Sequence, residues 1–410
     1  MDRIILHCDL NNFYASVECM LDPKLRDVPV AVAGSPKKRH GVVLAKNELA
    51  KKAGVRTGDV IWEAKLKEPA LVLVEPHFDL YSKYSRQVFD LYTRYTCYVE
   101  PFGPDECWLD VTGSVKLFGG GVQIADTLRR VVKDETGGLT LSAGVSFCKV
   151  FSKIASDLKK PDATTEVTRQ NFKQIIWPLP VSYMLMVGGK TTEKFTKLNI
   201  RTIGALAAAD ENVLKSILGA NGVKLIRNAA GFDDEPVREY VKSRDIKSVG
   251  HGMTAVKDIR GYGDAEAMLF YLADKIAVRM RRYGVRAGGI AVDLRDANLQ
   301  SITRQCKLPA PVRNATDIGR AAAALTRENW DLAMPLRTLT VSAFDLTDAA
   351  APVQASMFAA ADLEKNDRLD LALDKIRDKY GSSAILRANL IERDFIYDKT
   401  DDEDFLPFKR

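Results

Sequence analysis

The stretch Phe102-Gly103-Pro104-Asp105-Glu106-Cys107-Trp108-Leu109-Asp110-Val111 joins two adjacent carboxylates to an apolar run. Gly and Pro mark a turn, and the run after the carboxylates has the composition of a strand. A strand predicted at 95–99 would place the carboxylates at the turn of a hairpin. Neighbouring strand residues face opposite ways, so both carboxylates reach one site only if the chain bends there. Magnesium prefers carboxylate, water and phosphate oxygens, but a solvated acidic turn has the same residues.

A third carboxylate, Asp9, follows an apolar run at residues 3–8 that predicts a buried strand. Phe13, Tyr14 and Val17 then recur at helical spacing, so a helix is expected to begin near Asn12. At this junction Asp9 either helps to hold an ion or caps the helix.

The first 165 residues alternate between strand and helix patterns, which indicates an α/β or α+β domain. Lys46, Lys51 and Lys52 lie near a strand-to-helix junction, where lysines either hold a triphosphate or face solvent. Further strands are expected at 28–33, 41–45 and 139–147, and helices at 47–53, 81–92, 122–133 and 148–160.

Composition narrows the class of protein. The chain has 410 residues, of which 46% are hydrophobic and 28% charged, as in ordinary globular proteins. No apolar run is long enough for a bilayer, and the N-terminus has no signal-peptide pattern. The six cysteines form no CxxC pair, so neither a zinc site nor a disulfide framework is expected, and a reducing, cytoplasmic location is predicted.

Charge is unevenly distributed along the chain. Residues 238–345 are net basic and residues 353–410 are net acidic. This pattern favours a polyanion-binding domain followed by a docking segment, although ordinary variation could also produce it.

Three motifs together resemble those of the Y-family, translesion DNA polymerases, and most closely their bacterial branch. Asp9–Glu18 resembles the first motif and Gly103–Asp110 the second. Ser142–Ser146, with Lys149, Lys153 and Lys160-Pro161, resembles the third. The motifs occur in the family's order, and the likeness extends through most of the chain.

The resemblance implies a multidomain α+β fold of the right-hand polymerase type. The palm, a mixed sheet with helices, would comprise 1–11 and 77–167, and small fingers 12–76. A helical thumb with helix-hairpin-helix turns would span 168–235. A linker at 236–248 would lead to an α/β little finger at 249–348, and 349–410 would form a tail.

The resemblance also implies a template-directed, low-fidelity polymerase for lesion bypass. Two Mg²⁺ ions would be held by Asp9, Asp105, Glu106 and the main-chain carbonyl of Leu10. Tyr14 would be the steric gate against ribonucleotides. The nucleotide-binding residues would be Phe13, Tyr14, Lys51 and Lys160.

Two positions depart from the family pattern. Lys51 stands where many relatives have Arg, which weakens that phosphate contact because Lys lacks Arg's bidentate geometry. Glu48 stands where many relatives have Tyr, so the usual tyrosine contact is not expected.

Primer–template DNA, a deoxynucleoside triphosphate and the sliding clamp are the partners implied, with no membrane and a monomeric chain. Gln354-Ala355-Ser356-Met357-Phe358 resembles the clamp-binding peptide, with Gln354, Met357 and Phe358 as anchors. Phe405–Phe408 is the alternative docking segment. The DNA-contacting residues would be Gly188, Gly189, Lys190, Gly219, Gly222, Arg281, Arg282, Arg286, Arg295 and Arg304.

Two other functions fit parts of the pattern. The first is a non-catalytic scaffold that binds DNA and the clamp, although such relatives usually lose the carboxylates retained here. The second is a nucleotidyl cyclase, whose palm looks similar but which has no use for a thumb or a basic domain.

Overall fold

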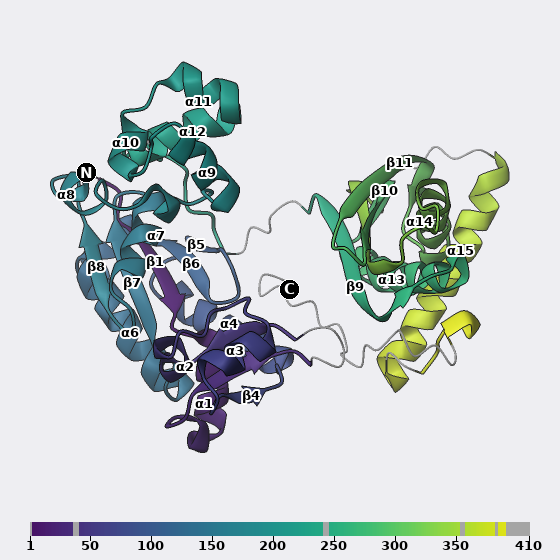
Figure 1. Cartoon of the computed structure of the whole chain (residues 1–410), viewed down its shortest axis with the longest axis horizontal. Coiled ribbons are helices and arrows are strands. Elements are labelled where there is room, and N and C mark those ends of the chain that lie inside the picture. The colour runs from purple at the N-terminus through teal and green to yellow at the C-terminus, as the bar shows by residue number, and fades with distance from the viewer. Residues whose placement is uncertain (1, 36–40, 241–245, 353–356, 382–383, 391–410) are drawn as a thin grey trace. The chain divides into compact units, whose positions relative to one another are not determined.

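The computed structural model describes residues 2–35, 41–240, 246–352, 357–381 and 384–390, with no side-chain description for 357–364. The chain divides into two compact units, one built mainly from residues before 240 and the other from residues after 246. Figure 1 shows the helices and strands of both units.

The first unit is organised around a five-stranded sheet with the order β5-β6-β1-β7-β8. Neighbouring strands run antiparallel except for β7 and β8, which are parallel. Thus β1, the N-terminal strand, lies at the centre of the sheet (Figure 1). The strands are β1 Ile5–Leu10, β5 Val99–Pro101, β6 Glu106–Asp110, β7 Leu141–Ser146 and β8 Thr164–Val167.

The pleat of β1 sorts its side chains between two faces of the sheet. Leu6, Cys8 and Leu10 belong to the hydrophobic core that α4 and α6 cover. His7 and Asp9 face α7 instead, where they meet Ser156 and Lys153. The helices around this sheet are α1 Phe13–Leu21, α4 Phe78–Thr93, α5 Val115–Phe118, α6 Gly121–Thr136 and α7 Lys149–Leu158.

Two smaller parts complete the first unit. A three-stranded sheet, β3-β2-β4, packs with α2 and α3 around its own core. Its elements are β2 Val30–Ala33, β3 Val43–Lys46, α2 Glu48–Lys52, α3 Ile61–Lys67 and β4 Val72–Val74. A helical cluster follows, with α8 Phe172–Ile175, α9 Gly189–Lys197, α10 Ile203–Ala207, α11 Glu211–Leu218 and α12 Ala220–Ala229 (Figure 1).

The second unit is a four-stranded antiparallel sheet, β11-β10-β12-β9, packed against two helices. The apolar faces of both helices and of the sheet form one hydrophobic core. The elements are β9 Ser248–Ile259, α13 Tyr262–Arg282, β10 Val285–Asp296, β11 Ser301–Val312, α14 Ala315–Asn329 and β12 Leu336–Asp348. A further helix, α15 Met357–Tyr380, follows.

The structure corrects two of the predicted elements. The strand expected at 95–99 begins only at Val99, because residues 95–98 lie in turns and loop before β5. The helix expected over 148–160 ends at Leu158, before Lys160 and Pro161. The mixed α+β architecture itself is as predicted.

Candidate active site

The three carboxylates predicted from the motifs come together on adjacent strands. Asp9 in β1 lies directly opposite Glu106 in β6. Asp105 precedes β6 in the turn of the hairpin, where its backbone carbonyl accepts a hydrogen bond from Leu10 N at 3.0 Å. In a regular strand, the side chains of Asp105 and Glu106 would point to opposite faces. Because Asp105 precedes the strand, this alternation does not apply to it. All three residues, and Leu10, line one cavity of about 360 Å³.

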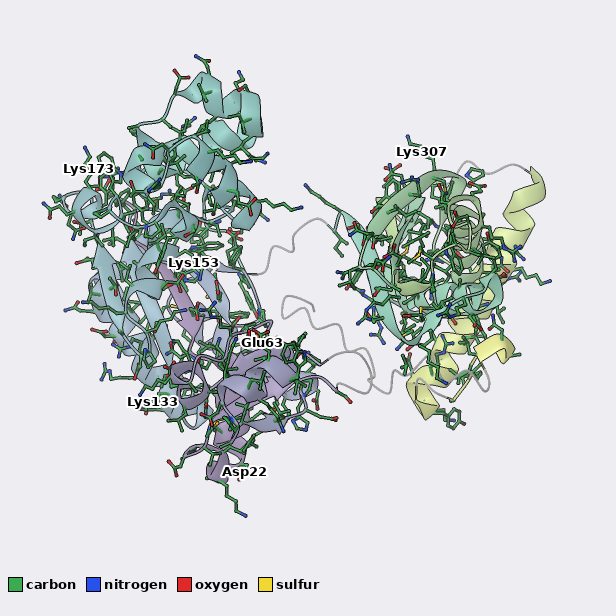
Figure 2. All side chains as sticks on the ribbon, viewed as in Figure 1. Asp22, Glu63, Lys133, Lys153, Lys173 and Lys307 are labelled. Carbon is green, nitrogen blue, oxygen red and sulfur yellow. The ribbon has the colours of Figure 1, made fainter. Side chains whose placement is uncertain are left out.

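Two lysines from α7 and the loop after it balance this negative charge. Lys153, which Figure 2 labels, belongs to α7. Its Nζ lies 3.0 Å from Glu106 Oε2 and 3.4 Å from Asp9 Oδ2. Lys160 Nζ lies 2.8 Å from both Asp9 Oδ2 and Asp157 Oδ1. The proximity of Lys160 to Asp9 puts the predicted nucleotide-binding lysine at the carboxylates.

The protonation states of the carboxylates follow from their surroundings. Burial, with the negative charges of Asp9 and Glu106, raises the pKa of Asp105 to about 7. Burial also raises the pKa of Asp9, although Lys160 opposes that shift. Burial would raise the pKa of Glu106 too, but His7 and Lys153 together hold it well below its usual range. Asp105 is therefore the carboxylate least compensated by the protein.

His7 is a site residue that the motif analysis missed. It is fully buried, with Nδ1 2.8 Å from Ser156 Oγ and Nε2 3.3 Å from Glu106 Oε2. Burial lowers the pKa of His7, so the ring is neutral at physiological pH. Its position two residues before Asp9 in the strand could have indicated that both share one face.

The donor set fits divalent cations. Glu106 Oε2 is buried and forms no hydrogen bond, although two nitrogens lie nearby. Among the described residues, no three carboxylates, histidines or cysteines already surround a single point where an ion could sit. The ammonium groups of Lys153 and Lys160 contact carboxylate oxygens of Asp9 and Glu106. These oxygens would otherwise be free to bind an ion.

An aromatic wall forms another side of the cavity. Phe13 and Tyr14, at the start of α1, both line it. The Tyr14 ring stacks on Tyr81, with centroids 4.3 Å apart, and meets Phe78 edge to face. Tyr81 in turn donates a hydrogen bond to Glu18. This stack fixes the Tyr14 ring at the cavity wall.

The small sheet brings a different lysine to the cavity from the one predicted. Lys51 is not among the cavity-lining residues, and its Nζ lies 3.3 Å from Glu48 Oε1. Lys46 and Thr57 line the cavity instead. The sequence placed Lys46 and Lys51 at one junction, but spacing could not show which lysine faces the cavity.

The glycines of the helical cluster differ in their surroundings. Gly188 precedes α9, Gly189 begins it, and Gly219 precedes α12 with a positive φ of 62°. A Cβ at any of these three would meet nothing within 4 Å, whereas one at Gly222 would lie 2.3 Å from Leu214 O. Gly222 therefore lets α12 pack closely on α11, which explains this glycine without a DNA contact.

Two of the arginines predicted to bind DNA form ion pairs with aspartates of α15. The Arg281 side chain is 6% exposed and binds Asp370 at 2.7 Å and Asp374 at 2.6 Å. Arg286 lies 3.3 Å from Asp367. Carboxylates of α15 thus pair with both arginines in this structure, and their contact with DNA phosphates stays a prediction. Exposed residues from the same prediction are Lys190, Arg282, Arg295 and Arg304.

The segment 354–358, predicted to bind the sliding clamp, lies partly outside the described residues. Gln354 lies outside the described residues. The backbone of Met357 and Phe358 begins α15, but their side chains also lie outside the description.

Comparison with solved structures defines the class of fold. A Y-family DNA polymerase chimera superposes with a TM-score of 0.75 at 23% identity, covering 84% of this chain and 99% of its own. The five-stranded sheet with its carboxylates thus belongs to a fold of the Y-family polymerase type. In the described residues, no helix has both the length and the apolar character needed to cross a membrane.

Comparison with protein families then gives the particular group. Residues 8–157 match the impB/mucB/samB family, and residues 246–357 match that family's C-terminal domain. The DNA polymerase IV of Acetivibrio thermocellus is 41% identical, covering 96% of this chain and 98% of the relative. The DNA polymerase IV 1 of Bacillus subtilis is 35% identical, covering 96% and 94%. The chain belongs to the impB/mucB/samB family of Y-family DNA polymerases.

Proposed function

We propose that this protein is a template-directed DNA polymerase of the translesion type, adding deoxynucleotides to a primer 3′ end. The observation that carries the proposal is the meeting of Asp9, Asp105 and Glu106 at one cavity with Tyr14 and Lys160. DNA polymerase IV relatives matched over nearly their whole length support the same activity.

Two Mg²⁺ ions would suit the site, and the carboxylates of Asp9, Asp105 and Glu106 and the carbonyl of Leu10 would hold them. Such a pair stabilises the attacking and leaving oxygens of phosphoryl transfer. The protein's own groups complete the chemistry. His7, neutral and buried, lies 3.3 Å from Glu106, and Lys153 favours the ionised form of that carboxylate. Lys160 presents an ammonium group at the cavity wall, where it suits a phosphate oxygen.

The architecture supplies a role for each part. We assign the five-stranded sheet and its helices to the palm, the small sheet to the fingers and the helical cluster to the thumb. The second unit would be the little finger. Gly188, Gly189, Lys190 and Gly219 would contact DNA backbone through the thumb, and Arg282, Arg295 and Arg304 would neutralise phosphates. Small fingers leave room around the nascent base pair, which suits tolerance of damaged templates and low fidelity.

Docking to a sliding clamp through Gln354, Met357 and Phe358 is also part of this proposal, together with a monomeric state and a cytoplasmic location beside the chromosome. Deleting 354–358 is expected to remove stimulation by the clamp while basal extension stays unchanged. Stimulation that persists after the deletion would transfer the docking role to Phe405–Phe408.

The deciding experiment for the polymerase is primer extension with Mg²⁺. Asp105→Ala and Glu106→Ala should each lower the rate by at least about 1,000-fold, since each removes charge from a phosphoryl-transfer site. Equal incorporation by the variants and the unmodified chain would refute the site. If the unmodified chain also extends no primer, the result would support the non-catalytic scaffold. The three carboxylates that meet at the cavity argue against that function.

A further inference from the structure

The cavity at the carboxylates has two cationic residues in its lining, Lys46 and Lys160. Their surroundings differ. Lys160 is bound to Asp9 and Asp157, both at 2.8 Å. Lys46 forms no ion pair with any carboxylate among the described residues, and its Nζ instead donates to Thr57 Oγ1 at 3.0 Å. The negative charges of Glu48 and Asp59 act on Lys46 only from beyond ion-pair distance.

The fold fixes the position of Lys46. It is the last residue of β3, paired with Ala31 in β2, and the next residue, Asn47, caps α2 through Ala50 N at 3.0 Å. The partner Thr57 lines the same cavity, so its hydroxyl steers the ammonium group along the wall. The half-buried ammonium group of Lys46 can therefore bind an anion in the cavity.

Lys51 has the opposite arrangement. It lies in the last turn of α2, outside the cavity lining, with Glu48 beside it at 3.3 Å. Glu48 is itself tied to Asn12, whose Nδ2 donates to Glu48 Oε1 at 2.9 Å. Glu48 thus gives Lys51 a carboxylate partner on its own helix.

We propose that Lys46, with Thr57, is the residue of the small sheet that binds the phosphate tail of the incoming nucleoside triphosphate, in place of Lys51. The inference rests on the proposed polymerase function. It requires only the chemistry of a polyphosphate anion meeting a half-buried ammonium group and a hydroxyl. A point charge suits such an anion, although it lacks the bidentate geometry of Arg.

The test measures KM for the nucleotide and kcat in primer extension, together with the inhibition constant of inorganic tripolyphosphate. Lys46→Met should raise KM on the order of tenfold, as expected for loss of one charged hydrogen bond, with a smaller change in kcat. The inhibition constant of tripolyphosphate should rise by a similar factor, because that inhibitor shares only the phosphates. Lys46→Arg should keep both values within about threefold.

Lys52→Met is the matched control, since Lys52 is an exposed lysine of the following helix, α2, and does not line the cavity. Its KM should equal that of the unmodified chain. Thr57→Val should raise KM by a smaller factor than Lys46→Met and provides a second reading if Lys46→Met folds poorly. Unchanged KM and inhibition constant in Lys46→Met, or a larger effect in Lys51→Met, would overturn the inference and leave the polymerase intact. Failure of the unmodified chain to extend any primer would overturn both.

Discussion

At the scale of single residues, the site concentrates negative charge that the fold alone does not neutralise. Lys153 and Lys160 lie close to Asp9 and Glu106, but no such ion pair is formed by Asp105 in the described structure. Asp105 is also the group whose pKa is raised to about 7. A raised pKa means that the ionised form is disfavoured in the folded, metal-free protein.

Asp105→Asn is therefore expected to stabilise the metal-free protein at pH 8. The folded-state pKa of about 7 exceeds the ordinary 3.8, so stability from Asp105 is complete below about pH 4 and is lost as pH rises through 7. The gain should be on the order of 2 kcal/mol at pH 8 and vanish near pH 4. Urea unfolding with a chelator, at both pH values, measures it. Equal stability of the two proteins at pH 8 would show that Asp105 is not strained by its neighbours.

Tyr14→Ala is expected to admit ribonucleotides, because the Tyr14 ring is held at the cavity wall by its stack on Tyr81. Loss of the ring should cut the preference for deoxynucleotides by about tenfold or more, the usual effect of removing a steric mismatch. The ratio of kcat/KM for the two sugars measures this. Tyr81→Phe is the control, since it keeps the stacked ring and loses only the hydroxyl bonded to Glu18. If sugar selection survives Tyr14→Ala, the gate lies elsewhere.

At the scale of elements, the close approach of α7 to β7 sets the position of the site lysines. A Cβ on Gly144 would lie 2.0 Å from Ser152 O and 2.5 Å from Ser156 N, so only glycine lets the helix rest on this strand. Lys153 lies on that helix, and Ser156 binds His7 from it. Gly144 of β7 therefore determines both how α7 packs on the sheet and where Lys153 lies in the site.

Gly144→Ala should destabilise the protein by about 2 kcal/mol or more, because the added methyl must displace backbone. It should also slow primer extension as Lys153 moves with α7. Thermal unfolding and single-turnover rates check the two effects. Gly113→Ala is the control, since a Cβ there meets nothing within 4 Å. A variant as stable as the control would mean that α7 can shift without loss.

The last helix, α15, turns its acidic face toward the protein. Asp370 contacts Arg281 and also accepts from Ala315 N at 2.8 Å, while Asp367 contacts Arg313 at 2.9 Å. Leu369, on the exposed side, is 53% exposed. The helix is thus fixed to the second unit by buried charges rather than by an apolar stripe.

Asp370→Ala should destabilise the second unit by about 3 kcal/mol, because it leaves the buried Arg281 cation without one of its partners. Asp378→Ala is the matched control, since Asp378 lies on the same helix and is exposed. Chemical unfolding of the whole chain, monitored with a probe in the second unit, measures the stability of both variants. An equal loss in both variants would indicate that the Arg281 cluster contributes little.

At the scale of the whole molecule, each unit has its own hydrophobic core. The core of the second unit draws on β9, α13, β10, α14 and β12 and also includes Leu390, well after α15. The described tail residues, 357–381 and 384–390, thus belong to the second unit. The net positive charge of residues 238–345 suits the backbone of DNA.

A fragment of residues 246–390 is expected to fold by itself and to bind DNA with strong salt dependence. A shorter fragment, 246–352, should be markedly less stable, because it lacks Asp370, Asp374 and Leu390. Thermal unfolding and DNA-binding titrations at several salt concentrations test both statements. If the shorter fragment is as stable as the longer one, α15 is not part of this domain.

The sequence alone determined the class of fold and the identity of the carboxylates, because both depend on local patterns. Apolar periodicity marks strands and helices, and Asp9, Asp105 and Glu106 each follow a recognisable local signal. The motif order carried the Y-family resemblance, which the family match and the DNA polymerase IV relatives confirm. The spacing of Lys46 and Lys51 could also be read from the sequence, but not which of the two side chains lines the cavity.

Only the tertiary structure decided which charged side chains face the cavity and which are paired. Lys51 and Arg281 looked free in sequence, yet Glu48 and the aspartates of α15 bind them. His7 looked like an ordinary strand residue, yet the pleat brings it to Glu106. The physical reason is that a side chain's charge partner is set by contacts between segments far apart along the chain. Local sequence specifies backbone conformation but not those contacts.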